Sequence, residues 1–341
     1  MPGFGKCSMK ALVHNPYWDS LGGGERYTSA FVKLLLDHGW QVDIQWPHDI
    51  SSDIKNRFGI NISRANFIDE LRTMNYELLF WLSDGSLPTS FAKKTIIHMQ
   101  YPFQNSLGKT LINQIKSQFY KFVVNSKFTK QVIDNEYHVN STVIYPPVDT
   151  SLFKPGKKEN IILYIGRFSN LTQRKGHDQL IKSFKNLKLD SWKLILAGGM
   201  GVGSTDKDIS NLKKLAAGSN IEFVFNPTFS QIQNLCAKGK IFWSASGYSA
   251  DKPIQTEHFG ITVVEAMAAG AVPVITNLGG HKEIVDHGKN GYLWDTPSQL
   301  ESLTLELTTH KTQLTTLSQA AIAKSKIFDI SEFSRRFLDL I

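Results

Sequence analysis

The sequence alternates short apolar segments with amphipathic segments of helical period, and this alternation extends along most of the chain. In the first instance an apolar segment, Lys10–His14, is followed by a glycine run at 22–24 and then by Glu25–His38. Apolar residues of this last segment recur three or four positions apart, which places them on one face of a helix. A second apolar segment, Val42–Trp46, comes next. The order strand, glycine loop, helix, strand is the opening unit of a doubly wound parallel sheet, so we predict an α/β protein.

The same alternation continues through both halves of the chain. In the first half we predict further strands at Leu78–Leu82, Thr95–His98 and Lys121–Asn125, which complete a first sheet, and a helix at Lys127–Asn135. In the second half we predict strands at Ile161–Ile165, Lys193–Ala197, Ile221–Phe225, Ile241–Ser244 and Val272–Ile275. Helices are predicted there from Gly176, Asp208, Ser230, Phe259 and Gly280. Two Rossmann-like domains are therefore expected.

The length of 341 residues supports two domains, because one hydrophobic core seldom serves so long a chain. Adjacent prolines, Pro146 and Pro147, forbid a helix and favour an extended connector, and we place the boundary just after them. The predicted domains are 1–150 and 151–330. The amphipathic tail 331–341 could pack back on either domain, and we assign it to the first.

Charge and composition restrict the partners. The 38 basic and 30 acidic residues give a net charge of +8, which favours anionic partners. No acidic residue lies between Asp84 and Asp134, whereas the stretch from Lys93 to Lys130 holds seven lysines among aromatic residues. The simplest interpretation is a solvated helix face with the aromatic rings in the core. The alternative is a face that docks on an anionic membrane.

Several classes of protein are not supported. No apolar run approaches the roughly 18 residues of a spanning helix, and the first residues do not resemble a secretory signal, so we expect a cytosolic protein that is at most peripheral on the inner face of a membrane. Cys7 and Cys236 lack a zinc or disulfide pattern and are interpreted as free thiols, and no metal is expected. No nucleic-acid module is recognisable, so no nucleic-acid partner is expected.

Two loops between a strand and a helix are suited to bind an anion. The glycine run lets backbone amides and a helix dipole approach a phosphate without side chains in the way, although a plain tight turn explains it equally well. The second loop carries Arg167 and Lys175 at the carboxyl edge of the second sheet, where open α/β sheets bind ligands. An Arg and a Lys there can clamp a diphosphate by charge-assisted hydrogen bonds.

Two carboxylates, Glu257 and Glu265, lie eight positions apart around the start of a predicted helix. Gly260 indicates that the helix begins between them, so Glu257 should lie in the entry loop and Glu265 within the helix. The apolar neighbours of Glu265 argue against a solvent-facing position. A carboxylate in such surroundings needs polar partners, and ligand hydroxyls would serve.

The segment EHFGITVVEAMAAGAVPVI, which contains both carboxylates, resembles the E-x7-E signature of retaining glycosyltransferases with the two-domain GT-B fold, of the family 4 type. Further stretches resemble that family in the same order: GGGER, VVNSKFTKQVI, VIYPPVDTSLF, YIGRF with RKG, and GGHKEIVDHGKNGYLW. The segments EHFGI and VVEAMAAG are similar to the corresponding segments of mannosyltransferases that extend dolichol-linked oligosaccharides. The resemblance implies two Rossmann-like domains that face a central cleft, and a metal-independent hexosyl transfer.

The resemblance also implies roles for particular residues. Arg167 and Lys175 would bind the donor diphosphate, Glu265 would hold the ribose hydroxyls, and Glu257 would face the hexose. The other implied donor-side residues are Gly23, Gly24, Phe259, Gly260 and Ile261. His98 matches an active-site histidine on the acceptor side, although a histidine at a strand end is as often a hydrogen-bonded core residue. The implied donor is GDP-mannose or a UDP-hexose, with a glycan or lipid-linked acceptor and no further cofactor.

Alternatives remain at this stage. A non-catalytic protein that binds sugar nucleotides or phosphosugars could use the same fold, because fold alone does not establish function. Asp206-Lys207-Asp208 has the form of a metal-binding D-x-D motif, but so short a pattern arises easily by chance. No G-x-S-x-G sequence supports a hydrolase.

Overall fold

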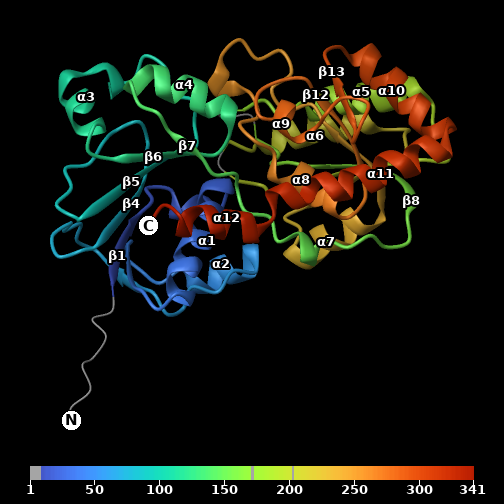
Figure 1. Ribbon diagram of the computed structural model, residues 1–341. Helices are drawn as coiled ribbons and strands as arrows, with labels where there is room; N and C mark the ends of the chain where they lie inside the picture. Colours follow the sequence, from blue (N-terminus) through green and yellow to red (C-terminus); the bar gives the residue numbers. More distant parts are fainter. Residues whose placement is uncertain (1–8, 170–172, 202) are drawn as a thin grey trace. The chain divides into compact units, whose positions relative to one another are not determined.

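The computed structural model describes residues 9–169, 173–201 and 203–341, so Cys7 lies outside the described residues (Figure 1). The chain divides into two compact units. The first unit contains the described residues up to Pro147 together with Phe333–Ile341, and the second contains Val148–Glu332. Each unit is built around one parallel sheet, which confirms the predicted fold class of two doubly wound α/β units.

The first unit has a seven-stranded parallel sheet in the order β3-β2-β1-β4-β5-β6-β7. Its strands are β1 (Lys10–His14), β2 (Gln41–Gln45), β3 (Asn66–Ile68), β4 (Leu78–Leu82), β5 (Lys94–Met99), β6 (Lys121–Val124) and β7 (Thr142–Val143). Its helices are α1 (Gly23–Asp37), α2 (Ser51–Phe58), α3 (Leu111–Ser117), α4 (Lys127–Tyr137) and the last turns of α12 (Ile330–Leu338). The strand order reverses its direction at β1, as expected for a doubly wound sheet.

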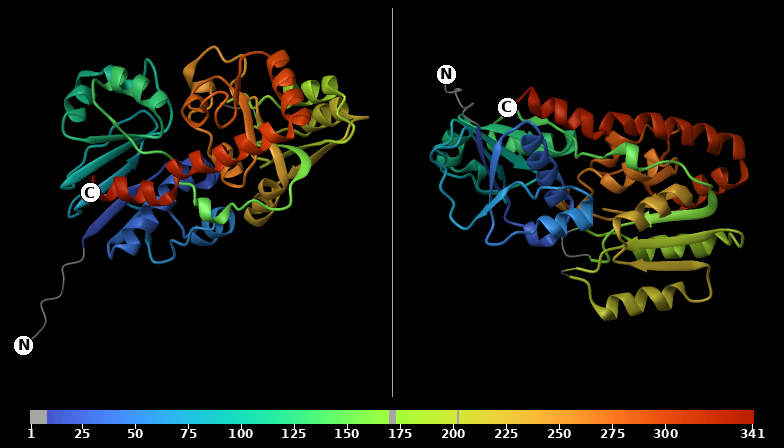
Figure 2. Two further views of the ribbon diagram at one scale, coloured as in Figure 1. Left: turned by 45° about the vertical axis from the view of Figure 1, so that its right-hand side comes forward. Right: turned by 90° about the horizontal axis from the view of Figure 1, so that it is seen from below.

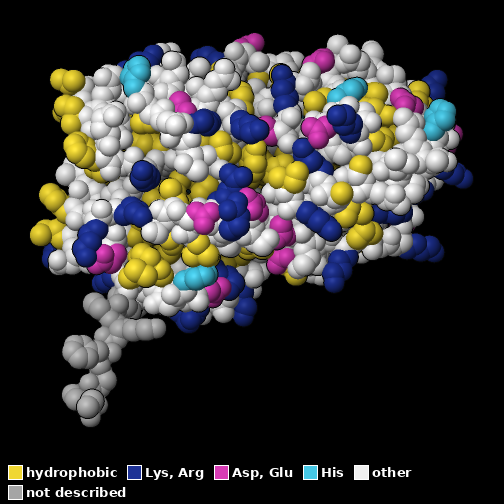
Figure 3. Space-filling model, in the orientation of Figure 1, with side chains coloured by type: hydrophobic (Ala, Val, Ile, Leu, Met, Phe, Trp, Pro, Cys, Tyr) yellow, Lys and Arg dark blue, Asp and Glu magenta, His cyan; other side chains and the backbone are white. Residues whose placement is uncertain are grey.

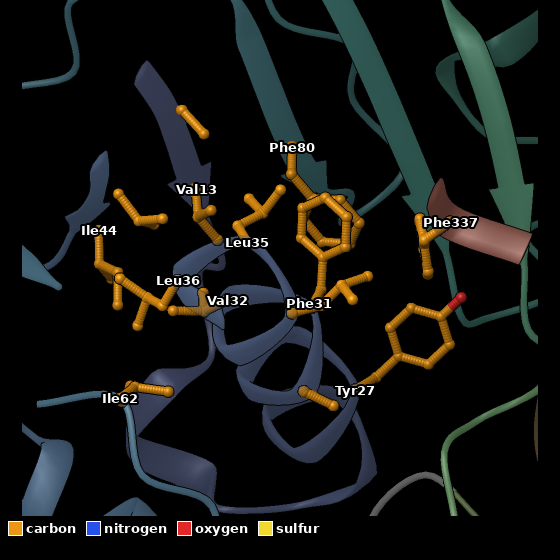
Figure 4. Close-up of a cluster of buried hydrophobic side chains, with 14 of the residues drawn as sticks. Val13, Tyr27, Phe31, Val32, Leu35, Leu36, Ile44, Ile62, Phe80 and Phe337 are labelled. Carbon is orange, nitrogen blue, oxygen red and sulfur yellow. The ribbon is translucent and has the colours of Figure 1, made fainter. Parts of the chain in front are cut away.

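The central strands of this sheet are buried along their length. Side chains alternate between the two faces of a strand, so both faces of the sheet are covered. On β4, Phe80 belongs to one hydrophobic core, whereas Leu79 and Trp81 belong to the other. The first core also contains α1, and Phe31 of that helix stacks on Phe80 with ring centroids 4.3 Å apart (Figure 4). The second core includes Tyr137 of α4. Helices α1 and α2 therefore cover one face, and α4 covers the other, with α3 packed beside α4 (Figure 1).

Helix α12 supplies two aromatic side chains to the first core. Phe333 and Phe337 are both buried, and Phe337 lies 4.6 Å from Phe31 between ring centroids (Figure 4). Just beyond the helix, Lys94 of β5 donates hydrogen bonds to the carbonyl oxygens of Leu340 and Ile341. Residues far apart in the sequence thus complete one core, in which the C-terminal segment is an integral part.

The second unit has a six-stranded parallel sheet in the order β10-β9-β8-β11-β12-β13. Its strands are β8 (Glu159–Ile165), β9 (Lys193–Gly198), β10 (Ile221–Phe225), β11 (Gly239–Ser244), β12 (Val272–Thr276) and β13 (Tyr292–Trp294). Its helices are α5 (His177–Leu187), α6 (Asp206–Ala216), α7 (Phe229–Lys238), α8 (Ile261–Ala268), α9 (His281–Ile284), α10 (Pro297–Thr309) and α11 (Lys311–Ser325). Helices α5, α6 and α10 pack with one another on one face, and α7, α8 and α11 on the other (Figure 2).

The differences from the sequence predictions concern the edges and the surface. All predicted strands are present, but three short edge strands, β3, β7 and β13, were not predicted. Helices α2, α3, α10 and α11 were not predicted either. Strands of two or three residues carry too few side chains for a period to be recognised, because alternation needs at least four positions.

Candidate functional site

The loop between β8 and α5 carries the first pair of predicted residues. Arg167 follows the buried end of β8, and its exposed guanidinium forms no ion pair with any residue in the described ranges. Lys175 comes at the other end of the loop, two residues before α5, and is buried. Because both lie at the carboxyl edge of a parallel sheet, they occupy the place where such sheets bind ligands.

Lys175 is joined to Glu257 by an ion pair. The Lys175 ammonium donates a hydrogen bond of 2.9 Å to Glu257 Oε2 and another of 2.8 Å to Gln173 Oε1. The two charged side chains are only 11% and 18% exposed, so water screens their attraction weakly. The structure therefore brings together two of the predicted residues that are 82 positions apart in the sequence.

The charges around this pair determine its protonation. Burial by itself would raise the pKa of Glu257. The attraction of the Lys175 ammonium, and of His281 where it is protonated at acidic pH, outweighs burial and lowers this pKa to about 2. Burial lowers the pKa of His258 and of His281 to about 4 each. At neutral pH the carboxylate is consequently charged, and the two imidazoles beside it are neutral.

Three glycines shape the backbone around Glu257: Gly260 at the start of α8, and Gly279 and Gly280 before α9. Gly260 has φ 112°, in the left-handed region that favours glycine, and it is the residue from which α8 begins. The Gly280 amide donates a 2.8 Å hydrogen bond to the Glu257 carbonyl. A Cβ atom at Gly279 would collide with that carbonyl, so this close approach requires glycine. The segment GGH before α9 thereby fixes the entry loop of α8.

The start of α8 presents the backbone of Phe259, Gly260 and Ile261. The first intrahelical hydrogen bonds run from the amides of Val263 and Val264 to the Gly260 carbonyl, so the Ile261 amide is not used inside the helix. Thr262 donates a hydrogen bond of 3.1 Å to the carbonyl of Ile165, the last residue of β8. The N-terminus of α8 is therefore adjacent to the strand end that leads to Arg167.

Tyr164, near the end of β8, contacts Ser246, which lies just beyond the end of β11. Its buried hydroxyl lies 3.2 Å from Ser246 Oγ, and burial raises its pKa well above the ordinary value. The charges of Glu257 and Arg167 both act on this hydroxyl, in opposite directions. Arg167 and the Lys175–Glu257 pair are thus gathered around one carboxyl edge.

Glu265, the second of the two predicted carboxylates, lies on α8. It is buried within α8, as the sequence predicted, and only 2% of it is exposed. Its charge acts on the thiol of Cys236 in α7, and burial together with this charge raises the pKa of Cys236 well above the ordinary value. Cys236 is a buried free thiol.

The glycine run lies in the first unit at the start of α1. The first intrahelical bond runs from the Arg26 amide to the Gly22 carbonyl, so the amides of Gly23 and Gly24 are not used inside the helix. Glu25 accepts a hydrogen bond of 2.6 Å from the Gly22 amide, which satisfies one donor at the start of the helix. Burial raises the pKa of Glu25, and the hydrogen bonds from Ser20 and Gly22 act in the opposite direction.

His98 lies inside the first unit. Its ring is fully buried on β5 and stacks on Tyr27 with centroids 3.8 Å apart, while Nδ1 lies 3.1 Å from the Val123 carbonyl oxygen. Burial lowers its pKa to about 3, so the ring is neutral. Nε2 has no hydrogen-bond partner among the described residues. In this conformation the ring reaches no solvent, so contact with an acceptor would require neighbouring side chains to move.

Three neighbours of the Lys175–Glu257 pair were not predicted from the sequence. Gln173 accepts from Lys175 and donates a 2.9 Å hydrogen bond to the Thr256 carbonyl, which ties the two loops together. His258 and His281 are the neutral imidazoles described above. Gln173 lies next to the basic residues of its loop, and His281 lies in the stretch GGHKEI. The only signal in the sequence was therefore that both residues lie in or beside motifs that resemble the family.

In the part of the chain that the structure describes, no group of three or more His, Cys, Asp or Glu side chains is arranged to hold a metal ion. Nor is any helix among these residues both long and apolar enough to cross a bilayer. Asp206 and Asp208 occupy the first turn of α6, where the Asp208 amide donates to Thr205 Oγ1 and both acids complement the helix dipole.

The low pKa of Glu257 predicts a pH dependence of stability. The carboxyl has its ordinary pKa of 4.5 in the unfolded chain and about 2 in the folded protein, so its ionisation contributes stability above pH 4.5 that is lost as the pH falls towards 2. The difference corresponds to about 3 kcal/mol. Urea unfolding of Glu257→Gln between pH 2 and 5 should therefore depend less steeply on pH than that of the unmodified protein.

The matched control for this measurement is Glu222→Gln on β10, which removes an exposed ion pair with Lys193. This control should keep the slope of the unmodified protein. Identical slopes for all three proteins would contradict the assigned pKa.

Comparison with known proteins defines the fold. The structure aligns with a glycosyltransferase from Rickettsia africae at a TM-score of 0.79 over 98% of both chains, with 20% identity. It also aligns with the Anabaena protein HepE in complex with UDP-glucose, at a TM-score of 0.71 and 16% identity, over 97% of this chain and 99% of that one. These similarities, with the two parallel sheets, define a GT-B fold.

Residues 149–313 match the family described as glycosyl transferases group 1. In sequence, the chain is 28% identical over 257 residues to the GDP-Man:Man(3)GlcNAc(2)-PP-Dol alpha-1,2-mannosyltransferase of Dictyostelium discoideum, a match that covers 67% of this chain. The chain spans 48% of the length of that relative. The chain is thus similar to the group 1 glycosyltransferases, and the residues that match this family lie in the second unit.

Proposed function

We propose that the protein transfers a hexose from a nucleoside diphosphate sugar to a hydroxyl acceptor with retention of configuration at the anomeric carbon. The observation that carries this proposal is the pairing of Lys175 with Glu257 at the carboxyl edge where Arg167 also lies. Cations there suit a diphosphate, and a charged carboxylate beside them suits the hydroxyls of the sugar.

The chemical difficulty is the departure of the nucleoside diphosphate while positive charge develops on the sugar ring. Fixed cations at the leaving phosphate lower this barrier most, because they stabilise the additional negative charge that develops on the departing oxygen in the transition state. In the proposed step the acceptor oxygen bonds to the anomeric carbon on the face that the phosphate leaves. The bond from that carbon to the phosphate oxygen breaks, and the departing phosphate takes the proton of the acceptor.

In this mechanism Glu257 orients the hexose and does not attack it. Its pKa of about 2 fits a permanently charged hydrogen-bond acceptor better than a proton donor, because it stays ionised throughout the physiological range. Trapping of a covalent glycosyl adduct on Glu257, detected by mass spectrometry, would contradict this role.

The remaining predicted residues complete the proposal. Glu265 holds the ribose hydroxyls, and the backbone of Phe259, Gly260 and Ile261 lies near the sugar and phosphate. In the first unit Gly23 and Gly24 approach the diphosphate, and His98 acts on the acceptor side after the rearrangement described above. Support for Gly23 and Gly24 comes from their amides, which the helix does not use.

The donor is GDP-mannose or a UDP-hexose, and the acceptor is a glycan or a lipid-linked sugar. HepE was crystallised with UDP-glucose, and the Dictyostelium relative is named for GDP-mannose and a dolichol-linked acceptor. These names support the class of donor and leave both bases as candidates.

Thermal unfolding with GDP, UDP and their hexose conjugates tests the proposal. A nucleotide at a hundred times its dissociation constant should stabilise the folded protein by about 2.7 kcal/mol and raise the melting temperature by roughly 5–10 °C. AMP is the control and should have no such effect. If no diphosphate nucleotide raises the melting temperature, the proposed site is wrong. Tight binding without transfer to any acceptor would instead indicate the non-catalytic alternative.

A further inference from the structure

Helix α3 of the first unit is amphipathic in the inverted sense, with its apolar side towards the solvent. Leu111, Ile112 and Ile115 lie on one side of the helix and are 73%, 67% and 56% exposed, and Phe119, which follows the helix, is 79% exposed. The spacing 111, 112 and 115 places three of these side chains on one side of the helix, and Phe119 follows two residues after its end. Hydrophobic side chains gather over α3 in the space-filling view (Figure 3).

The inward side of the same helix is polar. Asn113 and Ser117 are 8% and 3% exposed, and Ser117 Oγ donates hydrogen bonds to the carbonyls of Gln114 and Tyr137. The helix is therefore anchored to α4 by polar contacts, and its apolar residues take no part in the core. A helix that only covered a sheet would have the opposite arrangement, because burial of apolar surface drives packing.

A second segment extends this apolar surface. Phe91, in the loop between β4 and β5, is 69% exposed. Its loop is held against the end of α3: the Lys116 ammonium donates to Thr89 Oγ1 at 3.1 Å, and the Ser90 amide donates to the hydroxyl of Tyr120 at 3.3 Å. We call the surface formed by Phe91, Leu111, Ile112, Ile115 and Phe119 the α3 face.

Positive charge borders the α3 face. Lys109 precedes the helix, Lys116 lies on it, and Lys121 follows Phe119; Lys109 and Lys121 are exposed. Residues 85–133 contain no Asp or Glu. Of the nearby acids of α4, buried Glu136 accepts hydrogen bonds from the Asn105 and Ser106 amides and lies 3.8 Å from the Lys109 ammonium. Asp134 pairs with Lys130 at 2.6 Å, so Lys116 and Lys121 have no acid of α4 beside them among the ion pairs of the described residues.

We propose that the α3 face docks on the surface of an anionic lipid bilayer, with its apolar side chains among the upper acyl chains and the bordering lysines at the headgroups. Helices that lie in a membrane interface combine exposed Leu, Ile and Phe with Lys on their flanks. Protein interfaces, in contrast, are depleted in Lys. A bilayer is therefore favoured over a second copy of the chain or a protein partner. The inference is independent of the proposed transfer chemistry.

Flotation of the full chain with phospholipid vesicles tests the proposal. The protein should float with vesicles that contain phosphatidylglycerol and phosphatidylcholine, and at least about tenfold less with pure phosphatidylcholine, because each lysine at an anionic surface contributes about fivefold. The double variant Ile112→Ser/Phe119→Ser should lose this binding, and Lys121→Glu should weaken it by at least about fivefold. All three altered positions are exposed, so the fold does not depend on them.

Leu305→Ser/Ile327→Ser is the matched control, because it removes two exposed apolar side chains from the second unit. This control should float like the unmodified protein. The proposal is overturned if the unmodified protein does not prefer anionic vesicles, or if Ile112→Ser/Phe119→Ser floats equally well. It is also overturned if the unmodified protein forms a dimer that Ile112→Ser/Phe119→Ser abolishes, since the face would then bind a second copy. Nucleotide-induced stabilisation should be unchanged in every variant.

Discussion

Replacement of Lys175 by alanine is expected to reduce the rate of sugar transfer by about a hundredfold or more. Loss of one preorganised electrostatic group in an enzyme site costs on the order of 3 kcal/mol of transition-state stabilisation, and each 1.4 kcal/mol is a factor of ten in rate. Lys175 is both buried and held by Gln173 and Glu257, so its charge is fixed before the donor binds. Turnover of the purified variant with saturating donor measures the effect.

The same substitution leaves the Glu257 carboxylate without its cation. The cost of breaking a buried ion pair reaches about 3–5 kcal/mol, so the variant should unfold at a lower temperature. Assays should therefore be run well below that temperature, on protein whose folded circular dichroism spectrum has been verified. Under these conditions a loss of rate reports on the chemistry and not on unfolding.

Lys182→Ala is the control, because Lys182 lies on the neighbouring helix α5 and pairs with Asp178 at the surface. It should keep both the rate and the stability of the unmodified protein, since exposed ion pairs contribute little. A Lys175→Ala enzyme with a nearly unchanged rate would rule out the proposed role of Lys175 at the diphosphate.

Deletion of residues 333–341 is expected to unfold the first unit. The deletion removes Phe333 and Phe337 from the first core, along with the hydrogen bonds from Lys94 to Leu340 and Ile341. Removal of one buried Phe side chain costs about 3–5 kcal/mol, so the two together cost about 6–10 kcal/mol. That loss is comparable to the whole stability of a typical domain, about 5–15 kcal/mol.

Limited proteolysis measures this effect. The deleted protein should yield a resistant fragment that begins near Val148, because the contiguous second unit keeps its own sheet and helices. Phe337→Ala should destabilise the first unit by about 3–5 kcal/mol, whereas Arg335→Ala, which breaks an exposed ion pair with Asp339, should have almost no effect. A deleted protein that unfolds like the full chain would show that α12 does not support this unit.

The parts of the fold that the sequence predicted are those with a strong period. Strands β1, β4 and β8 are continuous apolar runs, and α1 and α5 carry an apolar stripe, so both types of element could be recognised before the structure was known. Helix α3 could not, because its apolar positions face the solvent and its inward positions are polar. Prediction from periodicity assumes that the apolar residues of a helix are buried, whereas those of α3 are exposed.

The candidate site was predictable in its residue types but not in its contacts. Arg167, Lys175 and Glu257 were singled out from motifs, and the structure places them around one sheet edge. The partners of the pair come from separate loops, and only the fold brings Gln173 and His281 beside Glu257. For His98 the sequence left two interpretations open, an active-site histidine and a hydrogen-bonded core histidine. It could not show the aromatic rings that stack on His98, because Tyr27 and Phe80 lie on other elements.

The discontinuous composition of the first unit has a consequence for its biogenesis. Although this unit is translated first, its core is closed only after residues 148–332 and then Phe333 and Phe337 have left the ribosome. At 5–20 residues per second, synthesis of the intervening stretch lasts roughly 10–40 seconds. Throughout that interval Tyr27, Phe31 and Phe80 lack their contacts with Phe333 and Phe337. The nascent chain therefore exposes an apolar surface of the kind that a ribosome-associated chaperone binds.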